Sequence, residues 1–207
     1  MKQFIALSLT ALTLGSAVAQ SQGFDADRPG GAPSGWTCGV TGGGQPRWQV
    51  EAAPDAPSKS HVLVQRGRGD FPWCVKAGSS VADGFVEVSF KSLDGREDQA
   101  GGVVWRWKDG HRYYVARANA LENNVSLYYT EGGTRHTLKY VDAPVAAKAW
   151  HRLRVEFAGR RIQVSLDGKR YIDVEDSHID GAGAVGVWTK ADSVTAFDDF
   201  IVSGAAR

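Results

Sequence analysis

The sequence has few of the features that mark a nucleic-acid-binding or membrane-spanning protein. Lys and Arg number 24 and Asp and Glu 23, so no excess of one sign points to a charged partner. Beyond the N-terminus no stretch approaches the roughly 18 apolar residues of a transmembrane helix. We therefore expect the mature chain to bind neither nucleic acid nor membrane.

The chain also lacks the common catalytic and metal-binding motifs. Its five histidines show neither H-x-H nor H-E-x-x-H spacing, which argues against a zinc site. No Gly-rich phosphate loop, Ser-His-Asp arrangement or Cys-His pairing is present. No window of a dozen residues carries an apolar period of 3.6, so helices are not expected to build the fold.

The N-terminus has the pattern of an export signal. Lys2 supplies a positive charge, residues 4–14 form a short apolar run, and Ala17-Val18-Ala19 matches a small-x-small cleavage site. We expect residues 1–19 to be a signal peptide cleaved after Ala19, and the protein to be secreted or periplasmic. A retained N-terminal anchor is the alternative.

Only two cysteines occur, Cys38 and Cys74. In an oxidising compartment an isolated pair most simply forms a disulfide. A reactive thiol or a metal ligand would need a nearby base or a second ligand pair, and neither cysteine has one in sequence.

From residue 48 onward, short runs of β-branched and aromatic residues alternate with Asp-Gly and Gly-Gly turn signals. The runs are 48–51, 61–65, 85–91, 102–107, 113–118, 125–130, 136–140, 151–157, 161–166, 169–174, 184–189 and 195–203. A dozen strands favour two stacked sheets over one open sheet. We expect an all-β, antiparallel, two-sheet β-sandwich of jelly-roll type over residues 48–207, acting as a monomer. Residues 20–47 are expected to form an irregular arm, and residues 143–149 one helical turn.

Several segments resemble known proteins. The hairpin WHRLRV (150–155) and IQVSLDG (162–168), with a tight turn at Asp167-Gly168, resembles that of laminin-G and concanavalin-like sandwiches. GGVVWRWKD (101–109), YYVARANALENNV (113–125), VGVWTKADS (185–193) and residues 197–200 together resemble the 3-keto-disaccharide hydrolase family, similar in fold to family 16 glycoside hydrolases. This resemblance implies action on 3-keto-glycosides or related oxidised sugars.

One departure argues against an ordinary two-carboxylate glycosidase. Family 16 enzymes carry their nucleophile and acid as E-x-D-x-x-E or E-x-D-x-E on one strand. The nearest run here is D-V-E-D at residues 173–176, beside a turn.

The chemistry that the resemblance implies is elimination: a base removes the proton beside the ketone, and the C1 substituent leaves. Such a site needs a base, a cation near the carbonyl oxygen and an aromatic face for the ring. The candidates are Glu122 as base, Lys190 and Arg117 as cations, Trp188 as ring platform, and Asn119, Asn123 and Arg106 as further sugar contacts. We expect six of these to converge on one concave face: Arg106, Arg117, Asn119, Glu122, Trp188 and Lys190.

Each candidate also has a plain structural interpretation. Glu122 lies in a polar stretch that suits a turn, Trp188 suits a core, and Arg117 suits an ion pair across the sheet. Trp105 and Trp107 are assigned to the core. Asp198 and Asp199 are either ligands of a structural Ca²⁺ or a surface acidic pair; no other cofactor is expected.

Two functions therefore remain open. One is a hydrolase or lyase with Glu122 and Lys190 as catalytic groups; the other is a glycan-binding sandwich without catalysis. An enzyme needs a base and a cation converging in one groove. A purely structural domain would show neither a groove nor clustered polar residues.

Overall fold

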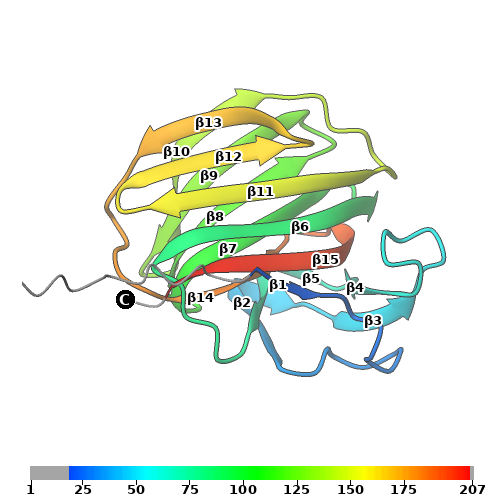
Figure 1. The fold of residues 1–207 in the computed structure, drawn as a ribbon. Helices are drawn as coiled ribbons and strands as arrows, with labels where there is room; N and C mark the ends of the chain where they lie inside the picture. The colour runs from blue at the N-terminus through cyan, green and yellow to red at the C-terminus, as the bar shows by residue number, and fades with distance from the viewer. Residues whose placement is uncertain (1–18, 206–207) are drawn as a thin grey trace, which may run out of the picture.

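Two antiparallel sheets packed face to face make up residues 19–205, the part of the chain that the computed structural model describes (Figure 1). The predicted signal peptide lies outside the described residues except for Ala19. Residues 19–205 contain no helix, so none is present that could cross a membrane.

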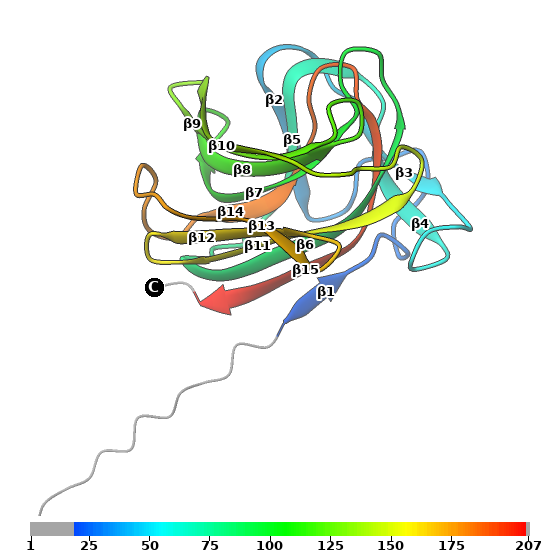
Figure 2. The ribbon, with the colours of Figure 1, turned by 90° about the horizontal axis from the view of Figure 1, so that it is seen from above.

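The first sheet has eight strands, seven of them in the order β13, β12, β11, β6, β15, β4, β3, with β1 also pairing with β15. Their bounds are β13 Lys169–Glu175, β12 Arg161–Leu166, β11 Trp150–Ala158, β6 Asp83–Asp94, β15 Val194–Ala205, β4 His61–Gln65, β3 Trp48–Ala52 and β1 Gln20–Gln22. The second sheet has seven strands: β10 Thr134–Asp142, β9 Asn124–Glu131, β8 Arg112–Asn119, β7 Ala100–Asp109, β14 Ala184–Trp188, β5 Arg68–Lys76 and β2 Trp36–Gln45, in that order. Figure 2 shows the two layers, with β2 and β5 rising away from the rest of their sheet.

The all-β sandwich prediction is confirmed, and all twelve expected runs are strands. Alternation explains why: Val86, Val88 and Phe90 of β6 are fully buried between the sheets, where they meet residues such as Trp105 and Leu127 of the second sheet. The predicted Asp167-Gly168 turn joins β12 to β13 with positive φ at both residues, 50° and 80°, as a two-residue hairpin requires.

The N-terminal arm differs from the prediction. Residues 20–47 are not an irregular arm, because they contribute β1 and the ten-residue β2, an edge strand of the seven-stranded sheet. The expected helical turn at residues 143–149 is likewise absent. The predicted disulfide is present: Cys38 of β2 lies directly opposite Cys74 of β5, and the bond ties the edge strand to its neighbour.

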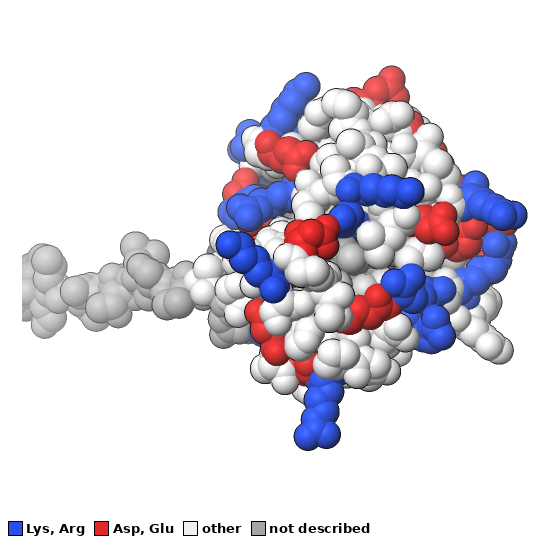
Figure 3. Space-filling model, turned by 90° about the vertical axis from the view of Figure 1, so that its right-hand side faces the viewer, with Lys and Arg blue, Asp and Glu red and all other residues white. Residues whose placement is uncertain are grey.

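Charged side chains of both signs are mixed over the face of the molecule shown in Figure 3. No patch of a single sign dominates that face, as the balanced composition leads one to expect.

Candidate functional site

The outer face of the seven-stranded sheet, turned away from the eight-stranded sheet, carries a second layer of buried side chains. Successive strand residues point to opposite faces, so Tyr114 and Ala116 enter the core while Tyr113 and Val115 of the same strand point outward. The outward layer also contains Trp73, Val75, Ala100, Val104, Tyr128 and Trp188, with Phe71 and Trp107 packed against it. The outer face of the seven-stranded sheet is therefore built on a buried layer rich in aromatic side chains.

A hydrogen-bonded set of polar side chains occupies one end of this face. We call it the Asp98 network; its members are Asp98, Arg117, Asn119, Glu122, Asn124 and Lys190. The Asp98 carboxylate accepts from Arg117 Nη1 (2.7 Å) and Asn119 Nδ2 (2.7 Å) and pairs with Lys190 Nζ (2.6 Å). The Glu122 carboxylate accepts from Arg117 Nη2 (2.6 Å) and from Asn124 Nδ2 (2.8 Å).

Burial divides the network into a fixed part and a reachable part. The Asp98 and Arg117 side chains are 0% and 3% exposed, whereas those of Lys190 and Glu122 are 28% and 35% exposed. The buried ion pair therefore holds the two outer charges in place, and those two are the groups that a ligand can reach.

Two loops bring the network together. The Asp192 carboxylate, just after Lys190, accepts from the backbone N–H groups of Arg96, Glu97 and Asp98 at 2.9, 3.0 and 3.1 Å. Asp192 thereby fixes the loop that delivers Asp98 to the start of β7.

The electrostatics of the network favour the charged forms of Glu122 and Arg117. Burial alone would raise the pKa of the Glu122 carboxyl, but the hydrogen bond from Asn124 and the charges of Arg117 and Lys190 outweigh it and hold that pKa below its usual value. For Arg117, burial is opposed by the charge of Asp98 and other partners, which raise its pKa. Glu122 is thus an ionised acceptor and a weak base.

The register of the sheet explains why Arg117 and Trp188 are neighbours. Gly102 of β7 lies opposite Arg117 of β8 on one side and opposite Trp188 of β14 on the other. A Cβ at position 102 would lie 3.3 Å from both side chains, so glycine allows them to flank this point closely. Of the predicted site residues, the structure brings together Arg117, Asn119, Glu122, Lys190 and Trp188.

Trp188 is not an open platform. Its ring is 0% exposed, stacks on Phe71 at 5.9 Å between centroids, and lies 5.8 Å from the Arg135 guanidinium. It belongs to the outer layer rather than to the core between the sheets, and neighbouring side chains cover it.

Arg106 lies apart from this set, so the structure does not bring it together with the other predicted site residues. A β-bulge occurs here: Arg106 has a φ of 47°, and β7 gains one residue relative to β14 between Val104 and Trp107. The bulge turns Arg106 inward, where it is 3% exposed and donates to the carbonyl groups of Ala82, Gly159 and Ile179.

The same bulge separates the two tryptophans that were assigned to the core. Trp105 stacks on Tyr114 at 5.2 Å between the sheets. Trp107 instead packs against Trp73 at 5.1 Å on the outer face. Only Trp105 is therefore a core residue.

Asn123, Asp198 and Asp199 serve local structure. Asn123, with a φ of 49°, accepts from the backbone N–H of Val145 through its side chain. The buried Asp198 carboxylate accepts from the backbone N–H groups of Ser58 and Asp199, both at 2.8 Å. Among residues 19–205, no three His, Cys, Asp or Glu side chains are grouped to hold a metal ion, so the calcium prediction gains no support.

The sequence interpretation missed Asp98, Asn124 and Arg135. Asn124 had a usable signal, because it lies directly after Glu122 and Asn123 at the start of a predicted strand. Asp98 precedes its strand within a charged loop, and Arg135 lies on another hairpin, so their convergence depends on strand pairing that the sequence does not display.

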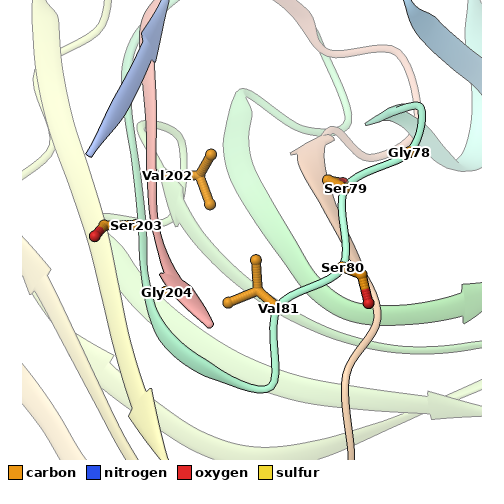
Figure 4. A pocket seen from close by; sticks show the side chains of 7 residues that line it. All are labelled: Gly78, Ser79, Ser80, Val81, Val202, Ser203 and Gly204. Carbon is orange, nitrogen blue, oxygen red and sulfur yellow. The ribbon is translucent and has the colours of Figure 1, made fainter. Parts of the chain in front are cut away.

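Several hollows lie outside the network, and one of them, of about 300 Å³, is lined in part by Arg106. Another, of about 460 Å³, adjoins the network and is lined by Gly43, Gly44, Arg68, Asp70, Glu97 and Ala191 among others. A third, of about 230 Å³, is lined by residues 78–81 and 202–204 (Figure 4). Its lining holds no ionisable side chain and none of the predicted site residues.

Comparison with solved structures finds several β-sandwich proteins with the same fold. It superposes on a carbohydrate-binding module, CBM66 from Bacillus subtilis, with a TM-score of 0.66 and 23% identity over 80% of this chain and 93% of that one. A Bacillus licheniformis β-glucanase matches with a TM-score of 0.60 and 12% identity over 93% of this chain and 100% of that one. A B. subtilis protein with a galectin-like fold matches with a TM-score of 0.59 and 15% identity over 83% of this chain and 90% of that one.

The chain shares their jelly-roll fold. No known protein family matches the sequence, and no curated protein matches it either. Membership of the 3-keto-disaccharide hydrolase family therefore remains a resemblance, and at these identities the structural likeness establishes fold alone.

Proposed function

We propose that this protein binds carbohydrate on the outer face of its seven-stranded sheet, without cleaving it. The observation that carries the proposal is the Asp98 network: a buried ion pair holds two partly exposed groups, Glu122 as acceptor and Lys190 as donor, in one patch. Preorganised charged groups of this kind suit sugar hydroxyls, which both donate and accept. The shared fold with a carbohydrate-binding module supports it.

The same contacts argue against catalysis. A general base works best when its pKa lies near the working pH. The pKa of Glu122 is instead held low, and its carboxylate already accepts two hydrogen bonds. Lys190 is paired with Asp98, so its charge is partly neutralised before any enolate could form.

Elimination from 3-keto-glycosides is the second candidate. It is favoured by one observation: Glu122 and Lys190 share one patch, close enough for the lysine charge to lower the carboxyl pKa. Glu122 would take the proton beside the ketone, Lys190 would stabilise the enolate oxygen, and those electrons would expel the C1 substituent.

Calorimetric titration of the mature protein with a panel of oligosaccharides, alongside product analysis with 3-keto-glucosides, separates the two. We expect saturable binding without product, and about a tenfold or larger loss of affinity in Glu122→Gln, because a charge-assisted hydrogen bond contributes about 1.5–3 kcal/mol. Turnover that disappears in Glu122→Gln while binding persists would establish the enzyme instead.

Glu156→Gln is the matched control. Glu156 is also a partly exposed carboxylate that accepts from an arginine, Arg154, but it lies on the other sheet. The Glu156→Gln variant should bind carbohydrate as tightly as the unmodified protein. If the unmodified protein binds none of the glycans, the proposal is refuted.

A further inference from the structure

A third cation, Arg135 of β10, lies on the same outer face without a counter-charge. Its guanidinium carbon is 4.3 Å from the ring centroid of Tyr128, 4.7 Å from that of Phe71 and 5.8 Å from that of Trp188. Its side chain forms no hydrogen bond or ion pair with any residue of the described chain, and its Nη1 is buried without a partner. The residue as a whole is only partly buried, so a ligand can approach it.

Arg135 and the Asp98 network form one continuous surface. Tyr128 links them, because its ring centroid lies 5.8 Å from the Arg117 guanidinium carbon as well as 4.3 Å from that of Arg135. Three cations, Arg117, Lys190 and Arg135, then face two carboxylates, Asp98 and Glu122. One positive charge is left over at the place where ring contacts concentrate.

An uncompensated cation among aromatic rings is costly, because burial removes its hydration. Consistent with this, burial lowers the pKa of Arg135. Aromatic contacts offset part of the cost but supply no acceptor for the guanidinium N–H groups. A planar carboxylate on the ligand would satisfy them with two parallel hydrogen bonds.

We infer that Arg135 is a carboxylate-recognition residue and that the bound glycan contains a uronic acid. This inference rests on the proposed function and names its ligand class. The Asp98 network would contact hydroxyl groups of the chain, while Arg135 pairs with the carboxylate of one sugar unit.

The test uses oligosaccharides of galacturonan, alginate and glucuronan, each beside its carboxyl-reduced neutral form, titrated against the mature protein. We expect at least one acidic form to bind about tenfold or more tightly than its neutral form, as expected for a charged hydrogen-bonded pair. Arg135→Gln should remove that preference, Arg135→Lys should retain part of it, and Arg154→Gln on the opposite sheet should leave it intact. The Arg135 Nε–Hε resonance should shift with the acidic form alone.

Equal binding of acidic and reduced forms, or a preference that survives Arg135→Gln, would overturn the inference while leaving carbohydrate binding in place. Binding of sulfated dextran that depends on Arg135, without binding of any uronate, would overturn the carboxylate assignment. Binding of no glycan at all would remove both proposals. The comparison of acidic and reduced forms on the unmodified protein stands even where Arg135→Gln fails to fold.

Discussion

At the scale of single residues, Asp98 determines what the outer face can do. Its carboxylate neutralises Arg117, holds Asn119 and pairs with Lys190. Removing one partner of a buried ion pair typically costs about 3–5 kcal/mol, so these charges are mutually dependent. Arg117 was expected from sequence either to pair with a carboxylate or to bind sugar; it forms the pair, and through that pair it positions Glu122.

Because the pKa of Glu122 is lowered, its contribution to the stability of the fold should depend on pH. A carboxyl group whose pKa is lower in the folded than in the unfolded state stabilises the fold above its unfolded value, here 4.5, and that stabilisation is lost as the pH falls through the folded value. Glu122→Gln should therefore be less stable than the unmodified protein at pH 7, by about 1 kcal/mol or less given its exposure. The difference should shrink below pH 4.5.

Urea unfolding of both proteins from neutral to acidic pH measures this difference directly. Other acidic groups titrate in both proteins and cancel when the two are subtracted. If the difference in free energy of unfolding stays constant down to strongly acidic pH, the Glu122 carboxylate is not stabilised by Asn124, Arg117 and Lys190.

At the scale of strands, alternation and turn residues predicted twelve of the fifteen strands. β5 was missed because Asp70 and Pro72 interrupt its pattern. Proline is tolerated there because β14 pairs with β5 only from Trp73 to Val75, beyond Pro72. β2 was missed because its three consecutive glycines suit a loop.

The β7 bulge shows where face assignment from sequence fails. One extra residue reverses which side every later side chain faces, so Arg106 and Trp107 exchange the expected sides. Nothing in GGVVWRWKD marks the bulge, which in the structure accompanies hydrogen bonds from Arg106 to carbonyl groups of neighbouring loops.

Arg106→Met tests this structural assignment. Each buried carbonyl left without a donor costs about 1–3 kcal/mol, so three of them should lower the free energy of unfolding by about 3 kcal/mol or more. Carbohydrate affinity should not change, since Arg106 lies outside the Asp98 network. Arg152→Met, a largely exposed arginine of β11, is the control and should cost less than about 0.5 kcal/mol. Unchanged stability of Arg106→Met in urea unfolding would contradict the assignment.

At the scale of the whole molecule, the sandwich leaves open sheet edges that could pair with another copy. β13 and β3 end the main strand order of one sheet, and β10 and β2 end the other. β13 carries Lys169, Arg170, Asp173 and Glu175, and β2 contains a register irregularity between Thr41 and Gly44. Charges and irregular backbone of this kind oppose edge-to-edge pairing.

We therefore expect a monomer in solution, with a sedimentation mass no greater than the 22.3 kDa of the full chain. Among the described residues only Leu121 and Tyr140 are large exposed hydrophobic side chains, too few to form an apolar contact surface. Replacing the edge charges of β13, as in Lys169→Val with Arg170→Val, should promote self-association, because the strand would then present uncharged unpaired backbone groups. Analytical ultracentrifugation of both proteins across the micromolar range decides this. A concentration-dependent dimer of the unmodified protein would show that one of its edges or faces is an interface.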